Sequence, residues 1–410
     1  MIRGLDTRAN SLVRERLPPH FDLARAVRPN ILSLAPYRCA RDDFQDGVLL
    51  DANENSLGPV LAGGSEQPVP VDALELHRYP HPALHGLREA ASALRNMPDP
   101  SFVFLGVGSD EVIDLIQRCF ARPGRGKVLV CPPTYGMYKV SAAINDLEVV
   151  EVPLRFDGSF GLDVPAINAT LAADPDIALV FLCSPGNPTG SLLPLDEVRA
   201  VLDNPSYNGL VVVDEAYIDF CLEEQTLGRK HGGKEISACS LVPYYANLIV
   251  SQTLSKSFGL AAIRVGLGFA QPATIQVLNN TKAPYSISTT TAYLAAQALA
   301  PPGVARMREQ VRQLLDNRTA LIADLERIPA LGRIVGTNDA NFVMVEVLSA
   351  PGGEPDSARA GAIYRTMAEQ FALIVRDRSH EPGCAGCLRI SVGTADENKQ
   401  CTALLEKLLA

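Results

Sequence analysis

Residues 177–190 of the chain are IALVFLCSPGNPTG, and residues 210–217 are LVVVDEAY. Each segment starts with an unbroken apolar run and ends in a polar loop. Strands of a parallel sheet are covered on both faces, so they show such runs instead of alternating apolar and polar residues. Three similar runs (FVFLG, KVLVC and NLIVS) alternate with helical patterns over about residues 76–300. This order of elements predicts an α/β domain with a mostly parallel central sheet.

The sequence on either side of this region has a different pattern. Prolines recur in residues 1–75 and interrupt the helical patterns, so we expect an arm without a core of its own. Residues 301–410 contain a long amphipathic stretch, followed by the strand-like segments NFVMVEV, ALIVRD and LRISV. The sequence therefore predicts three parts: an N-terminal arm (1–75), a large domain (76–300) and a smaller α+β domain (301–410).

The composition excludes several classes of protein. With 410 residues, of which 47% are hydrophobic, the chain is long enough for about two domains and too apolar for wholesale disorder. Its net charge of −9 argues against a nucleic-acid partner. No apolar run is long enough to span a membrane, and the first residues lack the apolar stretch of a signal peptide. Nine scattered cysteines, an odd number, favour a reducing compartment, so we expect a cytoplasmic protein.

A glycine-containing turn follows the first predicted strand. Gly106 and Gly108 precede Ser109 and Asp110, where a helix with an apolar face is predicted to begin. The free N–H groups at the start of that helix are suited to hold a phosphate. A dinucleotide-binding loop needs a third glycine, but Glu111 stands in its place, which disfavours a nicotinamide-dependent dehydrogenase.

Several polar side chains follow the predicted strands, at the sheet edge where α/β proteins bind ligands. Asn187 and Asp214 lie in the two loops quoted above, and Lys256 follows a further strand in the segment TLSKSFGLAAIR. A lysine in a crowded, partly desolvated place can lose its proton and form an imine with a carbonyl group. The serines beside Lys256, and Arg264 eight residues later, suit a phosphate. Each residue alone is more often structural, but together they predict a site for pyridoxal phosphate.

Six motifs, in this order, resemble those of the fold-type I aminotransferases, which use pyridoxal phosphate: GVGSDE, PPTYGMY, SPGNPTG, VVVDEAYIDF, TLSKSFGLAAIRVG and CLRISVGT. The further motifs LDANENSLGP, LHRYPHP and KAPYSIS narrow the resemblance to the histidinol-phosphate aminotransferase family, especially its fungal branch. The resemblance covers roughly residues 24–400. Departures from the family pattern include Gln252, where many relatives have arginine, and an insertion-like stretch at residues 222–243, and they bear on local loop shape.

The resemblance implies a role for each matching residue. Lys256 would bind the aldehyde of the cofactor covalently, and Asp214 would pair with its ring nitrogen. Tyr217 and Asn187 would hold the ring hydroxyl, and Tyr135 would stack on the ring. Lys256, Asp214 and Tyr217 are the predicted catalytic residues. The cofactor phosphate would be held by Ser109, Asp110, Ser255 and Arg264, with Glu111 in the same cofactor-binding group.

The resemblance also implies residues that bind the substrate. Arg389 resembles the arginine that grips the α-carboxylate of glutamate, for which a planar guanidinium is suited. Asn53 is expected to bind substrate as well. The phosphate ester of histidinol phosphate would be bound by Arg376, Tyr37 and Tyr285. The alternatives for Arg376 and Tyr37 are a surface ion pair and an arm-packing aromatic.

The resemblance at two tyrosines, Tyr79 and Tyr285, implies a dimer. Tyr79 is similar to a tyrosine that reaches the cofactor of the neighbouring subunit, and Tyr285 would act across the same interface. We therefore expect an obligate homodimer with shared active sites, small-molecule substrates, and neither a nucleic-acid nor a membrane partner.

No metal site is predicted. His77, His81 and His85 have the spacing of metal ligands on a helix, but Pro80 and Pro82 prevent one continuous helix through them. A single CxxC motif at residues 384–387 lacks a second pair, so we expect free thiols near the strand of the substrate arginine.

The implied reaction is transamination between L-histidinol phosphate and 2-oxoglutarate, which gives imidazole-acetol phosphate and glutamate in histidine biosynthesis. Lys256, displaced from the cofactor by the amino donor, would be the general base at Cα. Three alternatives stay open at this point: decarboxylation of a phosphorylated amino acid such as threonine phosphate, transamination of aromatic amino acids, and a non-catalytic binding protein with the same fold.

Overall fold

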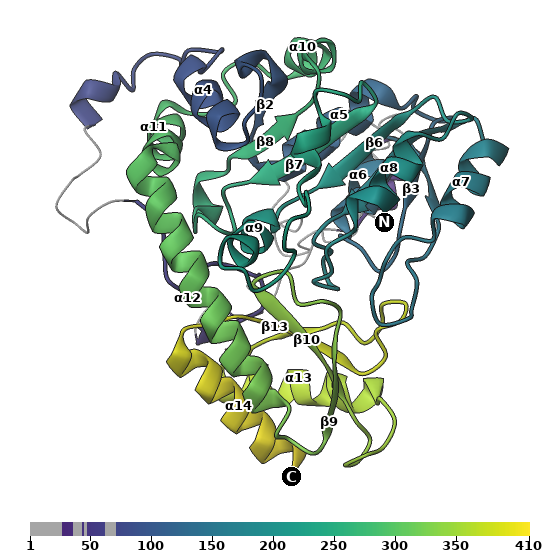
Figure 1. Cartoon of the computed structure of the whole chain (residues 1–410), viewed down its shortest axis with the longest axis vertical. Coiled ribbons are helices and arrows are strands. Elements are labelled where there is room, and N and C mark those ends of the chain that lie inside the picture. The colour runs from purple at the N-terminus through teal and green to yellow at the C-terminus, as the bar shows by residue number, and fades with distance from the viewer. Residues whose placement is uncertain (1–26, 36–42, 45–46, 62–70) are drawn as a thin grey trace, which may run out of the picture.

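The computed structural model describes residues 27–35, 43–44, 47–61 and 71–410. Figure 1 shows a large sheet with helices around it, a smaller sheet below it, and the long helix α12 (Pro301–Leu325) running beside both. None of the helices in these ranges combines the length and the apolar character that crossing a bilayer requires.

The large sheet, as described, has the strand order β2-β8-β7-β6-β5-β3-β4. Its strands run in one direction except for β8, which is antiparallel to both neighbours. All five apolar runs predicted as strands lie in this sheet, which confirms the predicted α/β architecture. The strands are β2 (Val103–Gly106), β3 (Lys127–Val130), β4 (Glu148–Glu151), β5 (Ile177–Cys183), β6 (Leu210–Asp214), β7 (Leu248–Thr253) and β8 (Gly266–Phe269).

The sequence pattern does not predict β8, because its four residues include two glycines, which are rare in strands. Gly266 has a packing reason. A Cβ there would lie 2.3 Å from the backbone of Gly108 and 2.6 Å from the N atom of Ser109. Glycine therefore allows the start of α5 (Gly108–Phe120) to lie directly against β8.

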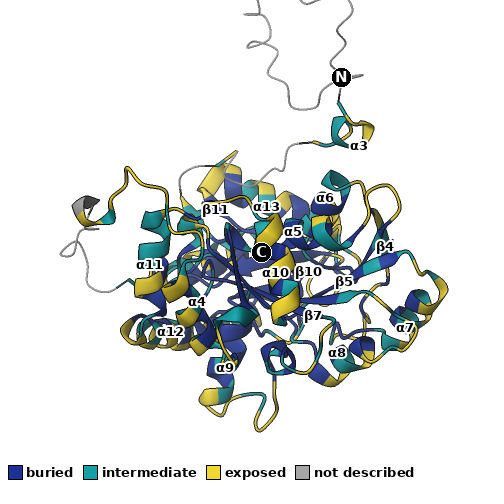
Figure 2. Cartoon of the chain, turned by 90° about the horizontal axis from the view of Figure 1, so that it is seen from above, coloured by how far each residue is buried: buried dark blue, intermediate teal, exposed yellow. Residues whose placement is uncertain are grey.

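Helices cover both faces of the large sheet. Because neighbouring strand residues point to opposite faces, Val128 and Val130 belong to one apolar cluster and Leu129 to the other. Figure 2 shows the strands buried between helices whose outer sides are exposed. The first face is covered by α5, α6 (Met137–Ile144) and α10 (Pro272–Thr281). The second is covered by α4 (His85–Leu94), α7 (Val164–Ala173), α8 (Leu195–Leu202), α9 (Ile218–Thr226) and α11 (Thr289–Leu299).

The small sheet is antiparallel, with the strand order β12-β13-β10-β9. The predicted strand ALIVRD divides into β11 (Leu373–Ile374), which pairs with the N-terminal segment, and β12 (Arg376–Asp377), which joins this sheet. The remaining strands are β9 (Leu331–Val335), β10 (Phe342–Val347) and β13 (Cys387–Ser391). The helices packed beside them are α12, α13 (Ser357–Phe371) and α14 (Ala395–Leu409).

The described parts of the N-terminal segment pack against the rest of the chain. β1 (Val48–Leu49) pairs in parallel with β11, and the N–H of Leu50 donates to the carbonyl oxygen of Ile374 at 2.7 Å. The single-turn helix α3 (Pro29–Leu32) lies beside α6 and begins at a proline, whose fixed φ suits a first turn. The 3₁₀ turns are η3 (Val71–Leu74), η4 (Pro100–Phe102), η5 (Ala238–Leu241) and η6 (Ala261–Ile263).

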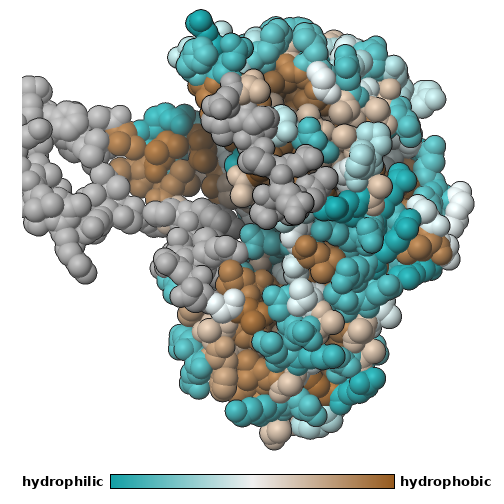
Figure 3. Space-filling model, turned by 90° about the vertical axis from the view of Figure 1, so that its left-hand side faces the viewer, coloured by the Kyte–Doolittle hydropathy of each residue, from teal (hydrophilic) through white to brown (hydrophobic). Residues whose placement is uncertain are grey.

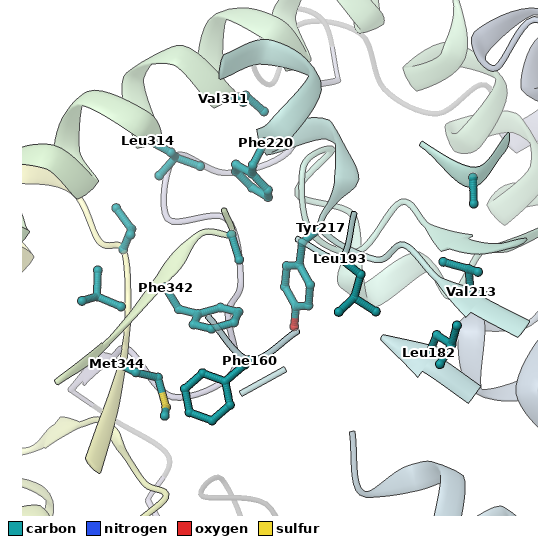
Figure 4. Close-up of a cluster of buried hydrophobic side chains, with 14 of the residues drawn as sticks. Phe160, Leu182, Leu193, Val213, Tyr217, Phe220, Val311, Leu314, Phe342 and Met344 are labelled. Carbon is teal, nitrogen blue, oxygen red and sulfur yellow. The ribbon is translucent and has the colours of Figure 1, made fainter. Parts of the chain in front are cut away.

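One apolar cluster runs from the large sheet to the small sheet. Figure 4 shows Tyr217 between Leu193 and Phe342, with Phe220 above it facing Leu314 of α12. The rings of Tyr217 and Phe342 meet edge to face, with their centres 5.3 Å apart. This shared core holds the small sheet against the carboxyl ends of β5 and β6.

Candidate active site

A pocket of about 260 Å³ lies where the carboxyl ends of β5, β6 and β7 meet the small sheet. Residues 51–54, the start of α5 and several arginines complete its wall. The structure thus brings together side chains that are far apart in the sequence. Twelve residues predicted to bind cofactor or substrate line the pocket: Asn53, Ser109, Asp110, Tyr135, Asn187, Asp214, Tyr217, Ser255, Lys256, Arg264, Arg376 and Arg389.

Lys256 stands in the turn after β7, where it is half-buried and not a solvated surface lysine. Its Nζ donates to the carbonyl oxygen of Ala52 at 2.8 Å and lies 5.9 Å from the centre of the Tyr217 ring. Burial, and then the positive charge of Arg389, lower the pKa of Lys256 to about 8. More of this amine is therefore neutral near pH 8 than of an ordinary lysine, as a nucleophile or general base requires.

Asp214 ends β6, between Cys183 of β5 and Ser251 of β7. The hydroxyl of Tyr138 donates to its Oδ2 at 2.7 Å, whereas its Oδ1 is buried without a hydrogen-bond partner among the described residues. Burial raises the pKa of Asp214 to about 6. A buried carboxylate oxygen without a donor costs free energy, so this position fits a ligand that brings a cationic N–H, such as a protonated pyridine nitrogen.

Hydrogen bonds join the N-terminal segment to the other side of the pocket. Asn53 adopts a left-handed backbone with φ of 53°, and its N–H donates to Ser391 Oγ at 2.8 Å. Its Nδ2 donates to the hydroxyl of Tyr217 at 3.0 Å. Asn187 Oδ1 accepts from Nη1 of Arg389 at 2.6 Å. These contacts place an amide, a phenol and a guanidinium side by side.

Arg389 is fully enclosed on β13. Its Nη2 donates to the carbonyl oxygen of Asp51 at 2.5 Å, and its Nε has no acceptor within the described part of the chain. Burial, followed by the positive charges of Arg378 and Arg376, lowers the pKa of Arg389 to about 9. A buried guanidinium in this situation is suited to bind an anionic substrate group.

The start of α5 offers a place for a second anion. The first N–H groups of an α-helix have no acceptor inside the helix, and those of α5 begin at Gly108. A Cβ on Gly108 would lie 2.4 Å from the guanidinium of Arg264, so glycine lets this arginine reach the helix start. Ser109 and Ser255 line the same end of the pocket. The arrangement fits a phosphate group.

The carboxylates of the neighbouring residues Asp110 and Glu111 point to different places. Asp110 lines the pocket, where its Oδ1 accepts from the hydroxyl of Tyr135 at 3.1 Å and its Oδ2 lies 3.4 Å from Arg264 Nη2. Glu111 does not line the pocket, because its Oε2 accepts from the N–H of Val107 at 2.5 Å. In this structure the Glu111 carboxylate therefore helps to cap the start of α5, and its expected cofactor contact stays a prediction.

Tyr79 and Tyr285, the two tyrosines expected to act across a dimer interface, do not line this pocket. Tyr79 and Tyr285 stack on each other, with ring centres 4.8 Å apart, and are 83% and 45% exposed. They lie away from the pocket of their own chain, so a contact with a cofactor requires a second subunit. Tyr37 falls outside the described residues.

Several residues that line or support the pocket are not predicted from the sequence. Tyr138 follows Tyr135 by three residues, and both belong to the quoted motif PPTYGMY, which is the signal that could have indicated it. Arg378 follows Arg376 by two residues, the spacing of side chains on one face of a strand. The other residues missed in the pocket wall include Asp51, Glu54 and Thr253.

A buried polar network lies beneath the turn after β7. Arg95 Nη2 pairs with Asp219 Oδ1 at 2.6 Å, and Ser257 Oγ donates to Asp219 Oδ2 at 2.5 Å. Arg95 Nε also donates to Gln252 Oε1 at 2.6 Å, and Gln252 Nε2 donates to Glu215 Oε2 at 2.8 Å. Arg95 thus supplies a cation to this network beside the glutamine that departs from the family pattern.

The insertion-like stretch 222–243 forms the end of α9, a loop and η5. Its loop contacts Asp339, whose Oδ1 lies 3.2 Å from Lys230 Nζ and 3.0 Å from His231 Nε2. Cys221, His231 and Asp339 form the one group of possible metal ligands within the described residues, and the Lys230 ammonium already places a cation there. The thiols of the CxxC motif at residues 384–387 are free and buried, as predicted.

Comparison with known proteins agrees with the geometry. The family model for aminotransferase class I and II matches residues 45–408. A histidinol-phosphate aminotransferase of Schizosaccharomyces pombe is 45% identical over 386 residues, which cover 92% of this chain and 95% of that protein. A histidinol-phosphate aminotransferase of Saccharomyces cerevisiae is 44% identical over 392 residues, which cover 92% and 95%.

The fold is also that of solved aminotransferases. The structure of histidinol-phosphate aminotransferase from Sinorhizobium meliloti in complex with pyridoxal-5'-phosphate matches with a TM-score of 0.76 at 23% identity. The match covers 93% of this chain and 97% of that one, which confirms the fold-type I architecture. The pocket, the fold and the extent of these matches lead to one conclusion: the chain belongs to the aminotransferase class I and II family.

Proposed function

We propose that the chain is a histidinol-phosphate aminotransferase that uses pyridoxal phosphate. It transfers the amino group of L-histidinol phosphate to 2-oxoglutarate and releases imidazole-acetol phosphate and glutamate, in histidine biosynthesis. Curated relatives of that name at 42–45% identity support the substrate pair. The observation that carries the proposal is the convergence of Lys256, Asp214 and Arg389 on one pocket, with an amine, an unpartnered carboxylate oxygen and an unpartnered N–H.

The chain's own groups divide the work of the reaction. Pyridoxal phosphate, when bound, withdraws electrons from Cα of the amino substrate and makes its proton acidic. Lys256 takes that proton as general base, for which a pKa of about 8 is suitable. Asp214 stays ionised beside the cationic ring nitrogen, and Arg389 orients the anionic end of the substrate. Residues 51–54 form part of the pocket wall and help to exclude water.

The remaining pocket residues hold the cofactor. The start of α5 binds the cofactor phosphate together with Ser109, Ser255 and Arg264. Asn187 and Tyr217 hold the ring hydroxyl, and Tyr135 stacks on the ring face. These assignments are supported by the placement of all these side chains in one pocket wall.

The active enzyme is a homodimer with shared active sites. Leu76, Tyr79 and Tyr285 are large exposed side chains near η3 and α11. Figure 3 shows hydrophobic areas on the side of the molecule where α11 and α12 lie in Figure 1. A second subunit on this side would bury such surface. The division of the chain at residues 75 and 300 and a cytoplasmic location also belong to this proposal.

A heterodimer experiment tests the shared site. Lys256→Ala and Tyr79→Ala chains with different tags are co-expressed, and dimers carrying both tags are purified. We expect each homodimer to be strongly impaired and the heterodimer to have about half the wild-type activity, because one of its two sites keeps both native residues. A heterodimer with only about half the activity of the Tyr79→Ala homodimer would show that Tyr79 does not act across the interface.

The reaction itself is tested by mixing the purified holoenzyme with L-histidinol phosphate and 2-oxoglutarate. Formation of glutamate and imidazole-acetol phosphate in equal amounts is expected. Turnover with aromatic amino acids at higher kcat/KM, or release of carbon dioxide from threonine phosphate without glutamate formation, would replace the proposed substrates by those alternatives.

A further inference from the structure

Three arginines share one face of the small sheet. Arg376 on β12 lies directly opposite Arg389 on β13 in the antiparallel register. Arg378 follows two residues after Arg376, and its N–H donates to the carbonyl oxygen of Cys387 at 2.9 Å, so the ladder continues to it. Asp377, between them, points the other way, because a Cβ on Gly361 of α13 would lie 3.3 Å from its Oδ2. All three arginines line the active-site pocket.

The positive charges of the three arginines act on one another. Like charges directly opposite each other on neighbouring strands destabilise a sheet. Arg378 is the first of the charged groups that lower the pKa of Arg389, ahead of Arg376, whereas Tyr217 and Asp51 act in the opposite direction. The negative charges Asp110 and Asp214 lie at the cofactor end of the pocket. Asp51 and Glu54 also line the pocket, and Glu381 pairs with Arg378, so carboxylates balance part of the charge of the three arginines. Three guanidinium groups on one face can still converge on the oxygens of an anionic ligand.

The two substrates of the proposed reaction differ at this end. Histidinol phosphate has no carboxylate, so its phosphate must take the place near Arg389 that the α-carboxylate of glutamate takes. A phosphate monoester has three terminal oxygens and close to two negative charges near neutral pH, whereas a carboxylate has two oxygens and one charge. Arg389 can satisfy two oxygens with its planar guanidinium, which leaves the third phosphate oxygen and the second charge for another cation.

We propose that Arg378 is that cation: with Arg376 it forms a two-arginine clamp that selects a phosphate monoester dianion over a carboxylate. The inference rests on the proposed function and adds to it a residue that sets specificity. Glu381 Oε1 lies 3.4 Å from Arg378 Nη1, and each side chain is about one-fifth exposed, so Glu381 is an ion-pair partner at the pocket edge that competes with an anionic ligand for Arg378.

The test uses the holoenzyme and three variants. For Arg378→Gln, we expect KM for histidinol phosphate to rise by about 10- to 100-fold, the effect of losing a hydrogen bond between charged groups, with kcat changed much less. The half-reaction with glutamate, followed in a single turnover by the cofactor absorbance, stays within about twofold. Arg378→Lys keeps the charge but loses the planar guanidinium, so we expect its KM for histidinol phosphate to lie between those of the wild type and Arg378→Gln. If Arg378→Gln does not fold, the KM of Arg378→Lys provides the test.

Glu381→Gln separates ligand binding from a structural role. If Arg378 serves only the ion pair with Glu381, both variants lose activity alike. If it binds phosphate, Glu381→Gln binds histidinol phosphate as well as the wild type or better. Arg333→Gln is the matched control, because Arg333 is a 74% exposed arginine that pairs with Glu346 within the same small sheet.

Inorganic phosphate keeps the inference independent of the proposed substrate. We expect it to inhibit the glutamate reaction of the wild type competitively, and its inhibition constant to rise about tenfold or more in Arg378→Gln. If the wild type fails to transaminate histidinol phosphate but this difference remains, the proposed function falls and the phosphate clamp stands. An equal loss for glutamate and histidinol phosphate, or an unchanged phosphate inhibition constant, would overturn the clamp.

Discussion

Replacing Lys256 by alanine is expected to lower transamination of histidinol phosphate by about 10⁴-fold or more, the upper end of the contribution of a general base. The reason is that this amine both holds the cofactor and transfers the proton at Cα. Its half-buried place, 2.8 Å from the Ala52 carbonyl oxygen, gives it the lowered pKa of about 8 that both roles need. The rate of single-turnover reaction with glutamate, followed by absorbance, is the measurement.

Lys282 provides a matched control for this variant. It is also half-buried, its Nζ donates to the carbonyl oxygen of Leu105 at 2.6 Å, and burial lowers its pKa. It does not line the active-site pocket. Lys282→Ala is therefore expected to keep most of the activity. Loss of turnover to the same extent in both variants would mean that removal of either half-buried lysine damages the fold, and not that Lys256 carries the chemistry.

Replacing Asp214 by asparagine is expected to have the second-largest effect, about 10²- to 10³-fold on kcat. Asparagine preserves the shape and the hydrogen bond from Tyr138 but no longer holds a positive charge on the cofactor ring. Tyr138→Phe, which keeps the Asp214 carboxylate, should lower kcat far less. The ratio of the two effects, measured as kcat with saturating cofactor, separates the role of the charge from that of the hydrogen bond. Equal effects would contradict this assignment.

The same variant is expected to stabilise the protein without cofactor. Burial raises the pKa of Asp214 from 3.8 to about 6, so the folded protein loses stability as the pH rises from about 4 to above 6, when this carboxyl must ionise. The shift corresponds to roughly 3 kcal/mol at neutral pH. The free energy of unfolding of the apoprotein, measured with denaturant, should therefore be larger for Asp214→Asn than for the wild type at pH 8. At pH 4 the two values should differ little. A wild type that is the more stable form at pH 8 would contradict the cost assigned to Asp214.

The large sheet and most of the pocket are predictable from the sequence because their signals are local. Unbroken apolar runs mark β5 and β6, and polar residues directly after them must lie at the carboxyl edge of a parallel sheet. This reasoning alone places Asn187 and Asp214 at the site, and the turn after β7 adds Lys256. The resemblance then supplies what position alone cannot, namely the chemical role of each residue.

The remaining features depend on contacts between distant parts of the chain. The spacing of Arg376 and Arg378 suggests a shared face, but their place beside Arg389 is set by the register of β12 and β13, which no local pattern displays. The strand β8 is hidden because Gly266 serves the approach of α5 and not strand propensity. Glu111 belongs to a pocket-forming motif, yet its side chain turns back to cap the helix.

The most direct measurement of the central claim is reduction of the resting holoenzyme with borohydride, followed by peptide mapping. The account predicts that one cofactor per chain is fixed to the peptide that contains Lys256, and that the Lys256→Ala protein retains none after denaturation. A label on another lysine, or a wild-type protein from which all cofactor is released after reduction, would contradict the assignment of Lys256 and with it the proposed enzyme.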